Sequence, residues 1–245
     1  MPSSGSAHYG DHMAEAVLWG VIAAAPLLVG AVLAMLRAWP PRLLGIVLGF
    51  GAGALMASIA FELWEQGLEL AGPVPLVVGV AVGALTYYVA DRLVDARAKG
   101  EEAQGAPLAV GALLDGIPEQ LVLGIGLASG EGVGIALVVA ILVSNLPESI
   151  GSGADLLKGG MSRGRVFALW AVVTVVCALA TVAGFALADA VSTEFRAGTM
   201  GFAAGALLVM LVDSMVPEAQ SKAKESTGLA TVFGFAVAAG LALAA

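Results

Sequence analysis

Two short motifs in the middle of the chain combine carboxylate side chains with a proline, and both lie in strongly apolar sequence. The first reads Leu114-Asp115-Gly116-Ile117-Pro118-Glu119-Gln120, and the second reads Val143-Ser144-Asn145-Leu146-Pro147-Glu148-Ser149. Asp115 and Glu119 are four residues apart, so on a helix they share one face, and the same holds for Ser144 and Glu148. Such oxygen ligands suit a divalent cation.

The two prolines extend this chemistry to the backbone. A proline inside a helix removes one hydrogen bond and kinks the helix, which frees the carbonyl group four residues earlier. Pro118 and Pro147 therefore free the carbonyl oxygens of Leu114 and Val143. At membrane depth, freed carbonyl oxygens are further ligands for a cation.

The motifs lie in a chain whose composition is typical of an integral membrane protein. Of its 245 residues, 59% are apolar, 12% are charged and 33 are glycine. A soluble domain cannot cover so much apolar surface, whereas lipid accepts it. We predict an all-α protein of about eight transmembrane helices, since each crossing needs roughly 20 apolar residues. The predicted spans are 16–36, 43–64, 74–90, 107–128, 132–156, 166–188, 198–216 and 228–244.

Charge predicts how these spans are oriented. Ten of the eleven basic residues fall in loops on one side of this topology, and only Arg196 falls on the other. By the positive-inside rule, both termini are extracytoplasmic. We expect a plasma membrane protein, in a bacterium one of the inner membrane. Residues 1–15 would form an N-terminal tail, and residues 16–245 a single transporter domain with a cytoplasmic loop at about 91–106.

The carboxylates of the two motifs need an explanation at this depth. An ionised carboxylate in the hydrocarbon region is costly unless it faces water or a partner of opposite charge. The spans 107–128 and 132–156 contain no Lys, Arg or His. A bound cation or a bound proton remains, and both belong to transport.

A second similarity links spans two and seven. The heptapeptide Gly49-Phe50-Gly51-Ala52-Gly53-Ala54-Leu55 resembles Gly201-Phe202-Ala203-Ala204-Gly205-Ala206-Leu207, and acidic residues follow both. The two spans run in opposite directions in the predicted topology. We therefore predict an inverted repeat, with spans 1–3 and 6–8 arranged around spans 4–5, which is typical of secondary transporters.

At its two Pro-Glu motifs the chain resembles the ZIP family of divalent-metal permeases. The resemblance implies eight helices with both ends outside, and transport by alternating access. It also implies a metal site on spans four and five, formed here by Asp115, Glu119, Ser144, Asn145 and Glu148. Here Asp115 and Ser144 occupy positions where the family has His or Gln, and Gly116 occupies an Asn position. Span six offers only Thr174, Cys177 and Thr181, although many relatives have an acidic residue there. A site of oxygen ligands favours Mn²⁺, Fe²⁺ or Mg²⁺-like ions over Zn²⁺.

Other polar residues near the membrane surfaces are candidate ligands on the way in or out. They are His8, Asp11, His12, Glu62, Glu65, Asp155, Asp213 and Glu218. For the carboxylates the alternative is ordinary interfacial charge, and for the histidines it is a disordered terminal tail.

Several other functions are disfavoured. We expect no enzyme, because the chain has no Ser/His/Asp set and no nucleotide-binding loop, and we expect no cofactor, the metal being the substrate. A net charge of −8 argues against nucleic acid. The expected partners are membrane lipid and a divalent metal ion, and the Gly-rich helix faces are compatible with a homodimer. Two alternatives stay open: a proton-linked carrier of a different cation or small solute, and a membrane protein that transports nothing.

Overall fold

The structure, a computed structural model, describes residues 4–97, 105–128, 135–188, 190 and 192–244. Some helical side chains within these ranges are not described, among them those of His8, Asp11 and Asp115. The described chain forms ten α-helices and two π-helical segments. They are α1 (Ser4–Leu36), α2 (Pro41–Ser58), η1 (Ile59–Glu65), α3 (Gln66–Ala71), α4 (Pro73–Arg97), α5 (Gly105–Ala128), α6 (Ile135–Lys158), α7 (Arg163–Ala188), α8 (Thr193–Met210), η2 (Leu211–Met215), α9 (Val216–Ala223) and α10 (Ser226–Ala244).

These helices confirm the predicted all-α membrane architecture. Seven stretches of the described chain are long and apolar enough to cross a bilayer. Two of them combine several elements: α2, η1 and α3 form one stretch, and α8, η2 and α9 form another. The remaining predicted span, 107–128, lies within α5. The chain is an integral membrane protein, and which membrane face holds the termini stays a prediction.

Several helical stretches extend beyond the predicted span limits, and α1 and α4 are two examples. Helix α1 begins at Ser4, so the expected tail continues the first span as a helix, and His12 lies 3.5 Å from Glu15 one turn later. Helix α4 runs to Arg97, which shortens the predicted loop at 91–106. There Arg92 packs over the ring of Tyr88 one turn earlier, 4.9 Å from its centroid. Local contacts of this kind stabilise helix turns outside the lipid, where hydropathy no longer marks the helix.

Small residues determine how the helices pair. A Cβ atom added at Gly53 of α2 would overlap the carbonyl oxygen of Thr231 in α10, and one at Gly205 of α8 would overlap that of Val80 in α4. Likewise, a Cβ at Gly184 of α7 would overlap the Leu121 carbonyl oxygen in α5. Without a hydrophobic force between helices in lipid, such close approach supplies the packing energy.

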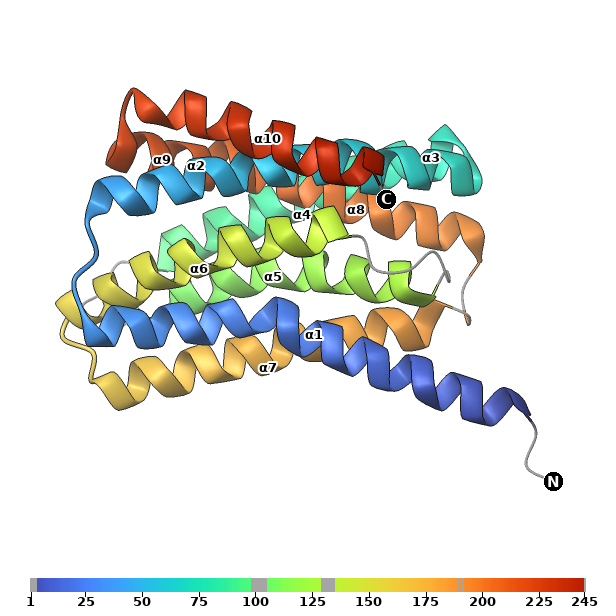
Figure 1. Cartoon of the computed structure of the whole chain (residues 1–245), viewed down its shortest axis with the longest axis horizontal. Coiled ribbons are helices and arrows are strands. Elements are labelled where there is room, and N and C mark those ends of the chain that lie inside the picture. The colour runs from blue at the N-terminus through green and yellow to red at the C-terminus, as the bar shows by residue number, and fades with distance from the viewer. Residues whose placement is uncertain (1–3, 98–104, 129–134, 189, 191, 245) are drawn as a thin grey trace.

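The pairs form two groups that run along a common direction (Figure 1). Helices α1, α5, α6 and α7 contact one another, while α2 packs on α10 and α4 packs on α8. The groups meet where α2 contacts α6 and where α5 contacts α8. Both Pro-Glu motifs therefore belong to one group, and both heptapeptides belong to the other.

The two heptapeptides precede the two π-helical segments at the same spacing. Segment η1 begins at Ile59, ten residues after Gly49, and η2 begins at Leu211, ten residues after Gly201. A π-helical turn holds one extra residue and is frequent at functional sites. The predicted relation between spans two and seven thus extends to a shared departure from α-helical geometry.

Candidate metal centre

The Pro-Glu motifs lie on α5 and α6, and their described polar side chains are largely buried. Glu119 and Ser144 are each 1% exposed and Asn145 is 2% exposed, while Glu148 is partly buried. Both helices run without interruption through Pro118 and Pro147, because a single missing backbone hydrogen bond does not end a helix that is packed on several sides. A carboxylate and two further polar side chains thus lie inside the bundle.

The predicted three-carboxylate site falls partly outside the described side chains, because that of Asp115 is among those not described. Among the described residues, no three His, Cys, Asp or Glu side chains form a group that could hold a metal. The described part of the site therefore consists of Glu119 and Glu148 together with neutral oxygen and amide groups. It is a site of hard oxygen ligands if it holds a metal.

A glutamine that the sequence analysis did not select lies beside Glu119. Gln120 is fully buried, and its Oε1 accepts a 2.5 Å hydrogen bond from the hydroxyl of Thr181 in α7. The amide nitrogens of Gln120 and Asn145 are buried without a hydrogen-bond partner among the described residues. Free amide donors next to carboxylates can orient them, or orient water on a bound cation. The presence of a glutamine inside an apolar span is the sequence feature that could have identified this residue.

Span five packs closely against α1 of its own helix group and against α2 of the other group. The Ser149 hydroxyl lies 2.7 Å from the Asn145 carbonyl oxygen and 3.1 Å from the Pro26 carbonyl oxygen of α1. On the other side, a Cβ at Gly51 of α2 would lie 3.0 Å from the Cα of Ser144. The first heptapeptide therefore touches the second Pro-Glu motif directly, at the boundary between the two helix groups.

Packing explains why position 116 is a glycine, which supplies no ligand. A Cβ at this position would lie 2.6 Å from the sulfur of Cys177, which is fully buried in α7. A larger residue at position 116 requires Cys177 to shift or to be smaller. The glycine at position 116, where the family motif has Asn, is thus compatible with the cysteine at position 177 in span six.

Glu62, a candidate entry or exit ligand, connects the two helix groups. It is 8% exposed, and its Oε1 accepts a 3.0 Å hydrogen bond from the backbone N–H of Leu137 in the first turn of α6. The first N–H groups of a helix have no partner within the helix, and an anionic acceptor there is favourable. Glu62 in η1 therefore caps the helix that carries Asn145 and Glu148.

Glu218 contacts the other end of the same helix. It forms an ion pair with Lys222 of α9. A Cβ at Gly151 of α6 would lie 3.0 Å from the Lys222 nitrogen and 3.4 Å from Glu218 Oε1, so the pair packs against α6. One carboxylate from each heptapeptide helix thus contacts α6, and both already have partners in the protein.

The remaining candidates are not brought to the centre. Glu65 and Asp213 are exposed, and Asp155 is exposed and paired with Lys158 at 2.9 Å. His12 is exposed, while the side chains of His8 and Asp11 are not described. These positions lie toward the surfaces of the protein and stay predictions as metal ligands.

Comparison with known proteins links the chain to zinc transporters. No protein-family model matches it. It is 29% identical to the zinc transporter ZIPB of Bordetella bronchiseptica over 250 aligned positions, which cover 92% of this chain and 80% of that protein. It is also 29% identical, over 197 positions, to a protein of Arabidopsis thaliana provisionally named a zinc transporter, with 76% of this chain and 31% of the relative covered. A zinc transporter of Mus musculus is 26% identical over 147 positions, which cover 55% of this chain and 31% of the mouse protein.

Proposed function

We infer that the chain is a member of the ZIP family of metal transporters and that it moves a divalent metal cation across the membrane between α5 and α6. The observation that carries this proposal is the burial of Glu119, at 1% exposed, and of Gln120, Ser144 and Asn145 in the same two motifs, whose spans contain no basic residue. A carboxylate in such surroundings is stabilised by a cation that it binds. The relatives are named for zinc, so a divalent cation is the simplest cargo.

Within this proposal, Glu119 and Glu148 are the charged ligands, with Asp115 as a third. Ser144 and Asn145 supply neutral oxygen atoms, and the amide of Gln120 orients the neighbouring carboxylate. Thr181 fixes that amide from α7. Ligands that are all oxygen accept Mn²⁺ or Fe²⁺ as readily as Zn²⁺, because imidazole and thiolate groups, which favour zinc, are missing from these motifs.

The arrangement of the two helix groups supports alternating access as the proposed mechanism. The motif helices lie in one group, and the helices that contact α6 near both ends lie in the other. A movement of the first group against the second would open the carboxylates to one membrane face at a time. The contacts at Gly53, Gly205 and Gly184 lie within the pairs α2–α10, α4–α8 and α5–α7, so such a movement leaves them intact. The contact between Gly51 of α2 and Ser144 of α6 lies between the groups and would have to change.

Uptake into liposomes tests the proposal. Purified protein is reconstituted, and influx of Zn²⁺, Mn²⁺, Fe²⁺, Cd²⁺, Co²⁺ and Mg²⁺ is measured together with internal pH. We expect saturable influx of at least one ion, and loss of it in Glu119→Gln and in Glu148→Gln. Glu69→Gln is the matched control, because it removes the same charge from an exposed position that is not among the candidate ligands and should transport normally. Normal flux in both motif variants would contradict the assigned site.

A further inference from the structure

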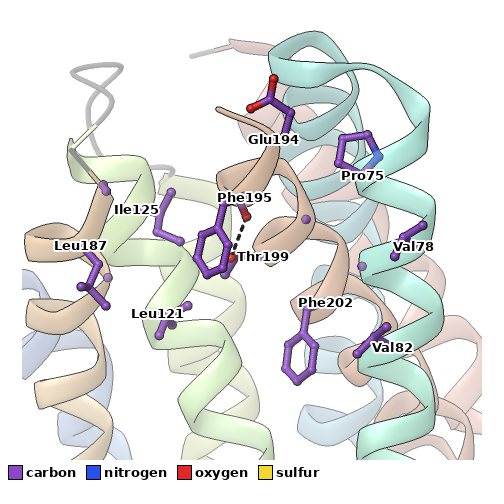
Figure 2. Close-up of a pocket in the computed structure, with 14 residues that line it drawn as sticks. Pro75, Val78, Val82, Leu121, Ile125, Leu187, Glu194, Phe195, Thr199 and Phe202 are labelled. Carbon is purple, nitrogen blue, oxygen red and sulfur yellow. Dashed lines mark hydrogen bonds between the residues drawn. The ribbon is translucent and has the colours of Figure 1, made fainter. Parts of the chain in front are cut away.

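A groove on the side of the bundle lies away from the proposed metal path. It has a volume of about 540 Å³ and is bounded by α4, α5, α7 and α8 at the end where α4 and α8 begin (Figure 2). Within each of the pairs α4–α8 and α5–α7, glycines bring the backbones into contact, as at Gly79 and Gly184. The groove is the space left between these two tight pairs.

The groove opens toward lipid. Its rim carries Val78, Leu187 and Phe195, which are 57%, 53% and 61% exposed in the protein. Exposed apolar side chains on transmembrane helices face hydrocarbon. The Thr199 hydroxyl donates a 2.9 Å hydrogen bond to the Phe195 carbonyl oxygen, so it adds no free polar group to the wall. The groove therefore offers a polar solute few hydrogen-bond partners in place of water.

One carboxylate marks the end of the groove nearest the membrane surface. Glu194, in the first turn of α8, lies at one end, whereas Val82 and Phe202 lie toward the other (Figure 2). Glu194 is exposed, and none of the described Lys, Arg or His residues forms an ion pair with it. The helix rises by about 12 Å over the eight steps from Glu194 to Phe202. This length is close to the roughly 15 Å of hydrocarbon in one leaflet.

We propose that the groove binds a single phospholipid with a primary-amine headgroup. One acyl chain lies along Val82 and Phe202, and the ammonium group of the headgroup lies at Glu194. A transfer of an acyl chain between two apolar surroundings gains no hydrophobic energy. The energy that favours a bound chain over a freely moving one therefore comes from dispersion contacts along the groove. The carboxylate gives the headgroup preference, because an ammonium group can donate hydrogen bonds to it and a quaternary choline cannot.

The test uses the full-length protein in phosphatidylcholine vesicles that contain a small fraction of phosphatidylethanolamine with a photoreactive acyl chain. Labelled peptides are mapped after illumination. We expect labelling concentrated on the segments of α4, α5 and α8 that hold Val82, Leu121 and Phe202. Unlabelled phosphatidylethanolamine should compete about threefold better than phosphatidylcholine, which is the ratio that a weak, partly screened charge contact produces. Glu194→Gln should abolish this preference.

A groove-filling variant separates specific binding from ordinary lipid contact. Gly198→Leu places a side chain in the groove, because a Cβ there meets only the Pro75 carbonyl oxygen, at 3.6 Å. Gly240→Leu is the matched control at the same end of the bundle, since a Cβ on this α10 residue meets nothing within 4 Å. We expect labelling to fall several-fold in the first variant and to stay unchanged in the second. Gly198→Val provides a smaller filler if the leucine variant does not fold.

Three outcomes would overturn the proposal. Uniform labelling of the lipid-facing helices, or equal labelling in wild type and both Gly198 variants, would mean general lipid contact only. A Gly198 variant that loses a dimer without losing label would assign the groove to a contact between two copies of the chain. Equal competition by the two unlabelled lipids would exclude the amine headgroup. None of these results depends on which ion the protein carries.

Discussion

The hydrogen bond from the Leu137 backbone N–H to Glu62 leads to a graded prediction about α6. Glu62→Gln keeps an oxygen acceptor for the Leu137 N–H and removes only the charge. Glu62→Leu keeps a similar volume but leaves that N–H without an acceptor at a site where Glu62 itself is only 8% exposed. The first change should lower the free energy of unfolding by about 1 kcal/mol, the difference between a charged and a neutral acceptor. The second should lower it by about 2 kcal/mol, since a buried donor then stays unpaired.

Unfolding of the purified variants in mixed micelles measures these differences. Glu65→Leu is the control from the same π-helical segment, and because Glu65 is exposed we expect a change within about 0.5 kcal/mol. The leucine variant should also transport less than the glutamine variant, because α6 carries Asn145 and Glu148. Equal stability of Glu62→Gln and Glu62→Leu would refute the reasoning, since it would show that the acceptor at position 62 contributes nothing to holding α6.

Two further predictions concern the contacts between α5 and α7. Gly116→Asn, which brings position 116 closer to the family motif, should destabilise the protein by about 1–3 kcal/mol because the new side chain overlaps Cys177. Cys177→Ala should recover part of that loss in the double variant. Purely additive changes in the free energy of unfolding across the double-mutant cycle would exclude this coupling. Thr181→Val removes the hydroxyl that donates to Gln120 Oε1 and should cost about 1 kcal/mol in the same unfolding assay, with no such cost when Gln120→Leu is already present.

The helices of the fold could be predicted from the sequence because a bilayer permits few backbone structures. A long apolar stretch in a bilayer must satisfy its backbone internally, so hydropathy alone locates the helices around Pro118 and Pro147. The burial of Glu119 and Asn145 followed from their positions in those spans. The helix ends at Ser4 and Arg97 did not follow, because outside the lipid short-range side-chain contacts decide where a helix stops.

The contacts of the candidate site were much less accessible to sequence reasoning. Glu62 binds a backbone N–H at Leu137, and backbone donors carry no sequence signal. The lack of a side chain at Gly116 looked like the loss of a ligand, and its reason, the sulfur of Cys177, becomes visible only when α5 and α7 are packed. The π-helical segments likewise depend on how neighbouring helices accommodate one extra residue.

The similarity of the two heptapeptide helices supports the predicted inverted repeat. Gly53 of α2 packs against Thr231 of α10 much as Gly205 of α8 packs against Val80 of α4, and a π-helical segment follows at the same spacing in both heptapeptide helices. Glu62 of η1 bonds to the first turn of α6, whereas the Glu218–Lys222 pair, which follows η2, packs against Gly151 nearer the last turns of α6. The helix that carries Asn145 and Glu148 is therefore contacted in its first turn by η1 and nearer its last turns by α9. A displacement of α6 along its axis would alter both contacts, so the proposed alternating access predicts that the two contacts change together.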